Sequence, residues 1–199
     1  MLETYLDRLM RRIQMLFGRG RLTFVDDSGS VQIVQVKTND LETSDTRYRM
    51  MEFGFSSNPP LGSDALMLHV AGDRSAGAVV ATNHQPSRPT GLQSGESMLY
   101  SQDGKQVYLT ADGGIVVEAK GQPVTINDAS DVTCNCSGVF KVIAPGGVVF
   151  DAPTVSATGD IIDQSETGGK SMASMRATYN DHDHNDPQGG VVGTPNQQM

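Results

Sequence analysis

The second half of the chain limits most strongly how this sequence can fold. After Leu109 the sequence has no leucine, and its apolar residues are mainly valine, isoleucine and alanine in short runs separated by turn residues. Short β-branched runs favour pleated sheet over helix. The predicted strands cover residues 97–101, 106–111, 115–119, 124–127, 132–136, 139–144, 148–152 and 155–157. Each strand has one apolar face and few neighbours in the chain that could cover it.

Composition indicates that partner chains cover these faces. Hydrophobic residues make up only 37% of the 199 residues, and there are 22 glycines and no tryptophan. A thin core in a chain of this length is typical of proteins that bury their apolar faces by assembly. Three identical strips around one axis form the smallest prism with an enclosed core and without free sheet edges. A single-chain β-solenoid or sandwich is the alternative.

The N-terminal residues predict an amphipathic helix over residues 2–17, within a segment 1–18. Leucine and isoleucine recur there at spacings of four and three, which is a heptad pattern; these residues are Leu2, Leu6, Leu9, Ile13 and Leu16. Two heptads are too short to form a coiled coil alone. We therefore expect the helix to pack on its own β-domain or on a partner, with a membrane-surface helix as the alternative.

Residues 19–90 predict a small barrel of the OB type. Alternating runs at 22–25 and 31–36 flank the turn Asp26-Asp27-Ser28-Gly29, and further strands are predicted at 48–55, 65–70 and 77–82. The Pro- and Gly-bearing segment 84–95 predicts a connector, followed by a shaft over 91–170 and an apex over 171–199.

Charge and hydropathy exclude some functions. The formal charge is −8; residues 1–22 carry five arginines against two acids, so the remainder carries −11. Such a balance argues against nucleic-acid binding, which requires a basic surface. No apolar run approaches the ~18 residues of a spanning helix, and we expect neither a membrane span nor a secretory signal.

Four of the potential metal ligands lack a ligand-like context. Cys134 and Cys136 point to the same face of a strand, in a poor geometry for pairing with each other. We expect them to be small buried hydrophobic residues without chemistry. His69 and His84 are expected to be structural.

The remaining histidines, His182 and His184, form the candidate metal site. Side chains at positions i and i+2 of an extended segment face the same way. One chain supplies two imidazoles, fewer than the three or four ligands that metals require, unless Asp181, Asp183 or Asn185 assist. On a three-fold axis the pair supplies six nitrogens, an octahedral set for a first-row metal. A solvated loop is the alternative.

An OB-like barrel, a Val/Gly-rich β segment and a terminal His182-Asp183-His184 together resemble the central baseplate spikes of contractile-tailed phages, of the phage Mu type. The resemblance implies an all-β homotrimer whose barrel attaches to the baseplate hub and whose shaft is an intertwined, triple-stranded β-helix. It also implies that His182 and His184 bind an iron ion shared by three chains. Calcium and chloride near the apex are compatible with it, but no residue is assigned to them.

The function implied is mechanical and not enzymatic. A spike assembled in the host cytoplasm would sit at the tip of the virion's tail baseplate and pierce the host outer membrane when the tail contracts, without a nucleic-acid or small-molecule substrate. A metal-dependent hydrolase with Asp186 as base is one alternative, although a six-histidine site leaves no position for water. A receptor-binding fibre tip is the other, although the polar segment 189–199 lacks an aromatic head.

Overall fold

The computed structural model describes residues 2–199, with side chains from Thr4 onward. Contacts divide the chain into two compact units, Met1–Ser130 and Asp131–Met199. We describe each unit by itself. No helix in the described part of the chain is long and apolar enough to cross a membrane.

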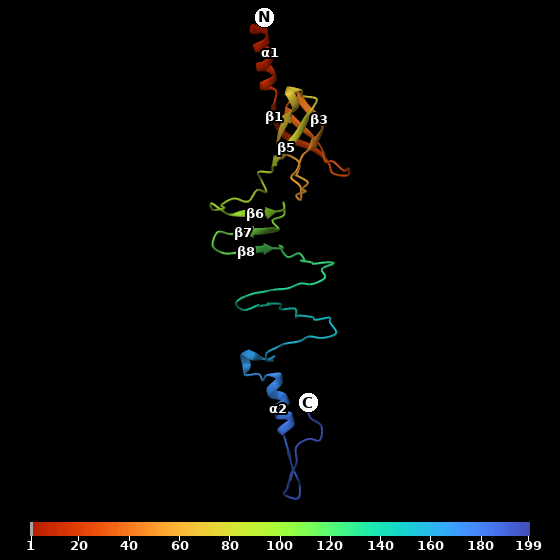
Figure 1. The fold of residues 1–199 in the computed structure, drawn as a ribbon, viewed down its shortest axis with the longest axis vertical. Coiled ribbons are helices and arrows are strands. Elements are labelled where there is room, and N and C mark those ends of the chain that lie inside the picture. Colours follow the sequence, from red (N-terminus) through yellow and green to blue (C-terminus); the bar gives the residue numbers. More distant parts are fainter. Residues whose placement is uncertain (1) are drawn as a thin grey trace. The chain divides into compact units, whose positions relative to one another are not determined.

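A closed five-stranded barrel is the best-packed part of the first unit (Figure 1). Its strands follow the order β1-β2-β3-β5-β4, in which β3 and β5 are parallel and the other pairs are antiparallel. Their bounds are β1 Phe17–Asp26, β2 Ile33–Asn39, β3 Glu42–Arg49, β4 Asp64–His69 and β5 Gly77–Asn83. A 3₁₀ turn, η1 Val70–Gly72, follows β4. This five-stranded barrel confirms the predicted OB-like domain.

The barrel core is formed by alternate residues of its strands. Six hydrophobic side chains are at most 2% exposed, namely Leu22, Val34, Val36, Ala65, Met67 and Val79. Strand β1 passes close to β2 at Gly20, where a Cβ atom would lie 2.4 Å from the carbonyl oxygen of Lys37. Only glycine fits that approach.

Two predicted elements of this unit have different bounds. The strand predicted at 48–55 is instead β3, Glu42–Arg49, and residues 50–62 form the connection to β4. The predicted strand followed the apolar residues Met50 to Phe55, whereas β3 itself is polar and forms backbone ladders with β2 and β5. The N-terminal helix, α1, covers Leu2–Gln14 and ends three residues early, because Phe17 pairs with Leu68 as the first residue of β1.

A three-stranded antiparallel sheet follows the barrel. It comprises β6 Ser97–Tyr100, β7 Gln106–Leu109 and β8 Ile115–Glu118, and confirms three of the predicted strands. Glu96, the residue before β6, links the segments around this sheet. Its carboxylate accepts hydrogen bonds from the Tyr108 hydroxyl and from the backbone N–H groups of Gln93 and Ala111.

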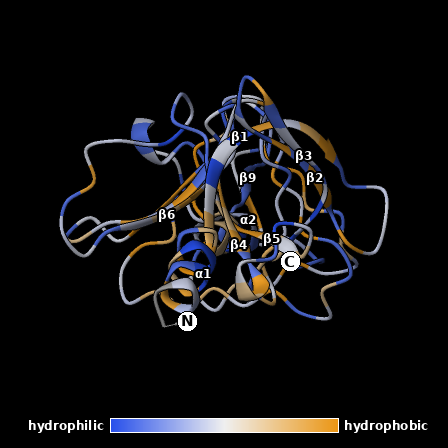
Figure 2. Ribbon diagram, turned by 90° about the horizontal axis from the view of Figure 1, so that it is seen from above, coloured by the Kyte–Doolittle hydropathy of each residue, from blue (hydrophilic) through white to orange (hydrophobic). Residues whose placement is uncertain are grey.

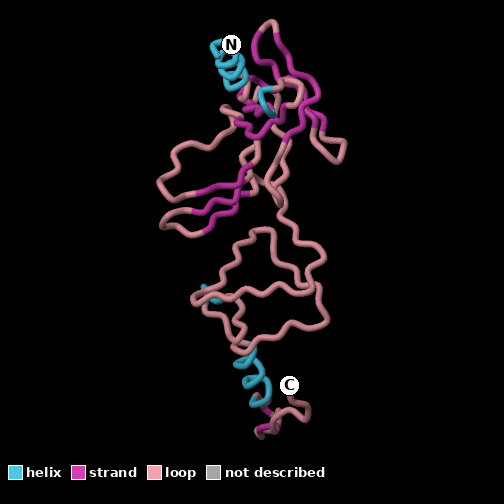
Figure 3. Tube along the Cα trace, turned by 45° about the horizontal axis from the view of Figure 1, so that its top comes forward, coloured by secondary structure: helices cyan, strands magenta, loops and turns pink. Residues whose placement is uncertain are grey.

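The five strands predicted between residues 124 and 157 do not pair within the chain. In the described residues this segment contains no strand and no bridge, and Figure 3 draws it as loop. Its apolar side chains are widely exposed, as Val139 at 88%, Val149 at 89% and Phe150 at 73% show. Figure 2 shows such hydrophobic residues along the chain outside the barrel as well as in it. One chain therefore cannot bury these faces.

The second unit ends in a short helix and a hairpin. Its elements are η2 Ser165–Thr167, α2 Met172–Asp181, β9 His184–Asn185 and β10 Val191–Val192. The expectation that apolar residues after Leu109 would form sheet and not helix is wrong for α2. Ser171 caps this helix by accepting the Ser174 N–H at 3.1 Å, and methionine and alanine within it are good helix formers.

Candidate metal centre at the histidine pair

The two histidines lie directly after the C-terminal end of α2. His182 is the C-terminal cap of α2 and has extended backbone angles, φ −72° and ψ 146°. His184 then begins β9, where it is opposite Val192 of β10. The segment is extended as predicted, and the His182 and His184 rings lie 5.0 Å apart between centroids in an edge-on arrangement.

The hydrogen bonding of His182 leaves one ring nitrogen available for a metal. Its Nδ1 atom lies 2.5 Å from the carbonyl oxygen of Tyr179. A carbonyl can only accept, so Nδ1 must carry the proton and donate it. The lone pair of the neutral ring is then on Nε2, the arrangement commonly found in metal-binding histidines whose other nitrogen is held by a backbone carbonyl.

Asp186, the acid nearest to the histidine pair in the turn after β9, forms hydrogen bonds within that turn. Its side-chain Oδ1 accepts the Gln188 N–H at 2.9 Å, and its backbone N–H donates to Gly190 at 2.8 Å. Gly189, with φ +89°, completes the turn. Asp186 therefore stabilises the hairpin.

The chain folds back beside the histidines. The Met199 N–H donates to the Asn180 side-chain oxygen at 3.0 Å, and the Asn180 amide donates to the Met199 carbonyl at 3.4 Å. A hollow of about 450 Å³ is lined by Lys170, Met175, Thr178, Tyr179, His182 and Met199. The sequence prediction missed α2 and these contacts; the available signal was a serine, Ser171, directly before a stretch rich in alanine and methionine.

A single chain does not complete a metal site here. Within the described residues no three side chains of the His, Cys, Asp and Glu types come together as a metal-binding group. The two imidazoles have the right donor chemistry for a first-row metal, but their number is insufficient. The histidine pair therefore fits a metal only if further ligands come from outside this chain.

The other predicted ligand candidates lie elsewhere. His69 is buried in the barrel, 4% exposed, with Nδ1 at 3.0 Å from the Met15 carbonyl oxygen. His84 Nδ1 lies 2.7 Å from the Ser87 hydroxyl oxygen. Both are structural histidines, as predicted. Cys134 and Cys136 are exposed in the single chain, not buried.

The fold and the site together define a class of structural protein. An OB-like barrel is followed by a β-branched segment whose apolar side chains stay exposed in the single chain, and two histidines lie close together in the second unit. Residues 19–86, which contain nearly all of the barrel, match the family described as "Bacteriophage Mu Gp45, N-terminal".

Two similar proteins extend this match over almost the whole chain. The chain is 28% identical over 204 residues to the baseplate puncturing device gp45 of Escherichia phage Mu, covering 96% of this chain and 94% of that protein. It is 27% identical over 184 residues to the Mu-like prophage FluMu protein gp45 of Haemophilus influenzae, covering 92% and 94%. These matches confirm the resemblance predicted from the sequence and support a place in a phage tail baseplate.

Proposed function

We propose that this protein is the central spike of a contractile tail baseplate, a homotrimeric needle that pierces the host outer membrane when the tail contracts. The observation that carries the proposal is the exposed apolar segment between residues 124 and 157. It has the strand-forming sequence of a sheet but no partner strand in the described chain. Two further copies would supply both the backbone partners and the apolar cover.

Burial of these side chains is large enough to stabilise an assembly. Covering one valine, isoleucine or phenylalanine side chain contributes about 1.5–3 kcal/mol. The segment exposes eleven such residues above half of their area; they are Val124, Ile126, Val132, Val139, Phe140, Val142, Ile143, Val148, Val149, Phe150 and Val155. Side chains alternate along a strand, so assembly would cover those on one face, and burying several of them per chain stabilises the assembly by more than a chance contact would. An intertwined, triple-stranded β-helix is the arrangement that pairs identical strips in this way.

The histidine pair supports the same stoichiometry. Three copies of His182 and His184 place six imidazole nitrogens around one axis, a complete octahedral set for a first-row metal such as iron. Such a metal would fasten three chain ends that otherwise fray. Since all six positions are filled by protein, the site has no open position for water, and its role is structural.

The barrel is the proposed point of attachment to the hub. It has its own core in a single chain, so it provides a rigid surface before and after assembly. The Mu protein that matches over most of this chain is described as a baseplate puncturing device. A spike needs one end that stays with the baseplate and one that meets the membrane, and the barrel and the apex are suited to these two tasks.

Mass and metal content of one purified sample test the proposal. Light scattering should give three chains per particle, and elemental analysis should give one first-row metal ion per three chains. A monomer would overturn the assembly, and one metal per chain would overturn the shared site.

A further inference from the structure

The exposed helix α1 is not explained by the barrel, the shaft or the apex. Among the described residues, the chain just after α1 is attached to the barrel: the Met15 carbonyl accepts from His69 Nδ1 at 3.0 Å, and the Leu16 carbonyl accepts from the His69 N–H at 2.9 Å. Gly72 packs against the last turn, since a Cβ atom there would lie 2.5 Å from the Arg12 carbonyl oxygen. These contacts fix where the helix leaves the barrel.

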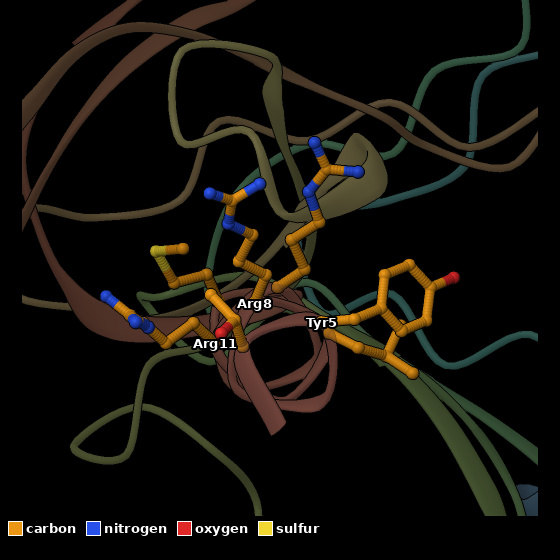
Figure 4. A pocket seen from close by; sticks show the side chains of 7 residues that line it. Tyr5, Arg8 and Arg11 are labelled. Atoms are coloured by element: carbon orange, nitrogen blue, oxygen red, sulfur yellow. The ribbon is translucent and has the colours of Figure 1, made fainter. Parts of the chain in front are cut away.

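The apolar side of α1 has no cover in the described chain. Leu6 and Ile13 are each 48% exposed, and Leu9 is 43% exposed. A hollow of about 640 Å³ along the helix is lined only by residues 4–15, that is, by the helix itself and Met15. Figure 4 shows Tyr5 and Arg11 leaving the helix on opposite sides, with Arg8 between them.

The spacing of these residues identifies the kind of surface that would cover them. Leu6, Leu9 and Ile13 repeat at three and four residues, which is the a/d pattern that packs against an identical parallel helix. Arg12 borders this stripe at the position that flanks a coiled-coil core, and Asp7 and Arg8 lie further round the helix toward solvent. No ion pair among the described side chains involves α1, so these charges are available.

We propose that three copies of α1 form a short parallel coiled coil at the N-terminal end of the assembly, with Leu6, Leu9 and Ile13 in its core. This inference rests on the proposed trimer. A helix of 13 residues is too short to associate alone. In the proposed trimer the shaft keeps the three helices close to one another. Their association is then effectively intramolecular, so even weak apolar contacts between the helices are enough to hold them together.

Disulfide trapping tests the inference on the full-length chain. In a Cys134→Ser, Cys136→Ser background, Leu9→Cys places a thiol in the seam, and Arg11→Cys places one on the outer side as the matched control. Mild oxidation with a copper–phenanthroline complex should convert most Leu9→Cys assemblies to covalent dimers with one free chain, while Arg11→Cys stays at the background level. Ile13→Cys should behave like Leu9→Cys.

The outcomes separate this inference from the trimer itself. A particle of trimer mass in which neither Leu9→Cys nor Ile13→Cys crosslinks would overturn the coiled coil and leave the spike intact. Binding of the parent protein to phosphatidylglycerol vesicles that is lost in a Leu6→Asp, Leu9→Asp variant would also overturn it, because the stripe would then face lipid. A monomer by light scattering would overturn the proposed function, and the coiled coil with it.

Discussion

The Nδ1 atom of His182 donates a hydrogen bond to the carbonyl oxygen of Tyr179, 2.5 Å away in the last turn of α2. Because a helix C-terminus presents carbonyl groups without helical partners, it can fix the tautomer of a histidine that follows it. The helix that sequence patterns missed is thus the element that engages Nδ1 of His182 and leaves its Nε2 without this partner.

Replacing both His182 and His184 by alanine should remove the metal and leave the trimer. In the proposed spike the metal would bind only near the chain ends, whereas the shaft would bury several apolar side chains of each chain. Elemental analysis and light scattering on the same fractions measure both properties. His84→Ala is the control, since His84 is also hydrogen-bonded but lies outside the apex and should leave the metal in place. Dissociation of the double variant into monomers would show that the apex, not the shaft, dominates assembly.

Gly72→Ala should destabilise the first unit more than Gly62→Ala. Both glycines have positive φ angles, +73° and +83°, so both substitutions carry backbone strain of about 1 kcal/mol or more. Only Gly72 also meets a neighbour, because its Cβ would lie 2.5 Å from the Arg12 carbonyl oxygen, whereas Gly62 faces open space. Urea unfolding followed by circular dichroism measures the difference. Equal losses would mean that α1 is not seated against Gly72.

Glu96→Gln should make the β6–β8 sheet less stable at neutral pH and less sensitive to acid. Hydrogen bonds from the Tyr108 hydroxyl and from the Gln93 and Ala111 N–H groups hold the pKa of Glu96 below its ordinary value of 4.5. The folded sheet therefore binds fewer protons than the unfolded chain near this pH. Its stabilisation is present above pH 4.5 and is lost as the pH falls through the lower folded pKa.

Urea unfolding at a series of pH values checks this prediction. The parent should lose stability on acidification below pH 4.5, and Glu96→Gln should lose less. Glu118→Gln is the control, as Glu118 lies in the same sheet but its carboxylate contacts Lys120 and not the groups that hold Glu96. The prediction is contradicted if both variants follow the acid dependence of the parent.

Phe150→Asp should weaken the trimer, while Val149→Asp should be tolerated. Side chains alternate along an extended strand, so Phe150 shares a face with Val148, and Val149 shares the other face with the charged Asp151. A face that carries Asp151 is suited to solvent. Losing one buried phenylalanine costs about 1.5–3 kcal/mol per chain before the cost of a buried charge is added. Light scattering over a dilution series measures the change, and equal effects would show that the faces are assigned wrongly.

The sequence predicted best those elements whose stability comes from alternating apolar residues. The barrel strands around Val34, Val36 and Met67 were found for this reason. Strand β3 was misplaced because its ladders are formed by polar residues, while the apolar Met50 to Phe55 lie in a connection. Helix α2 was missed because it buries no side chain and has no marked apolar face, so only its cap distinguishes it. The histidine pair was predicted from its spacing, from the expected three-fold assembly and from the resemblance to phage spikes; its hydrogen bonds depend on α2 and could not be predicted without that helix.

Hydrogen exchange across residues 124–157 tests the central claim most directly. These backbone amides have no ladder partners in the single chain, so in a monomer they should exchange as fast as those of an unstructured peptide. If three chains pair there as a triple-stranded β-helix, the amides should be protected to a degree comparable with those of the barrel strands. Protection that persists in the native particle and disappears on dissociation is the result the proposed spike predicts. Fast exchange throughout this segment in a trimeric particle would contradict it.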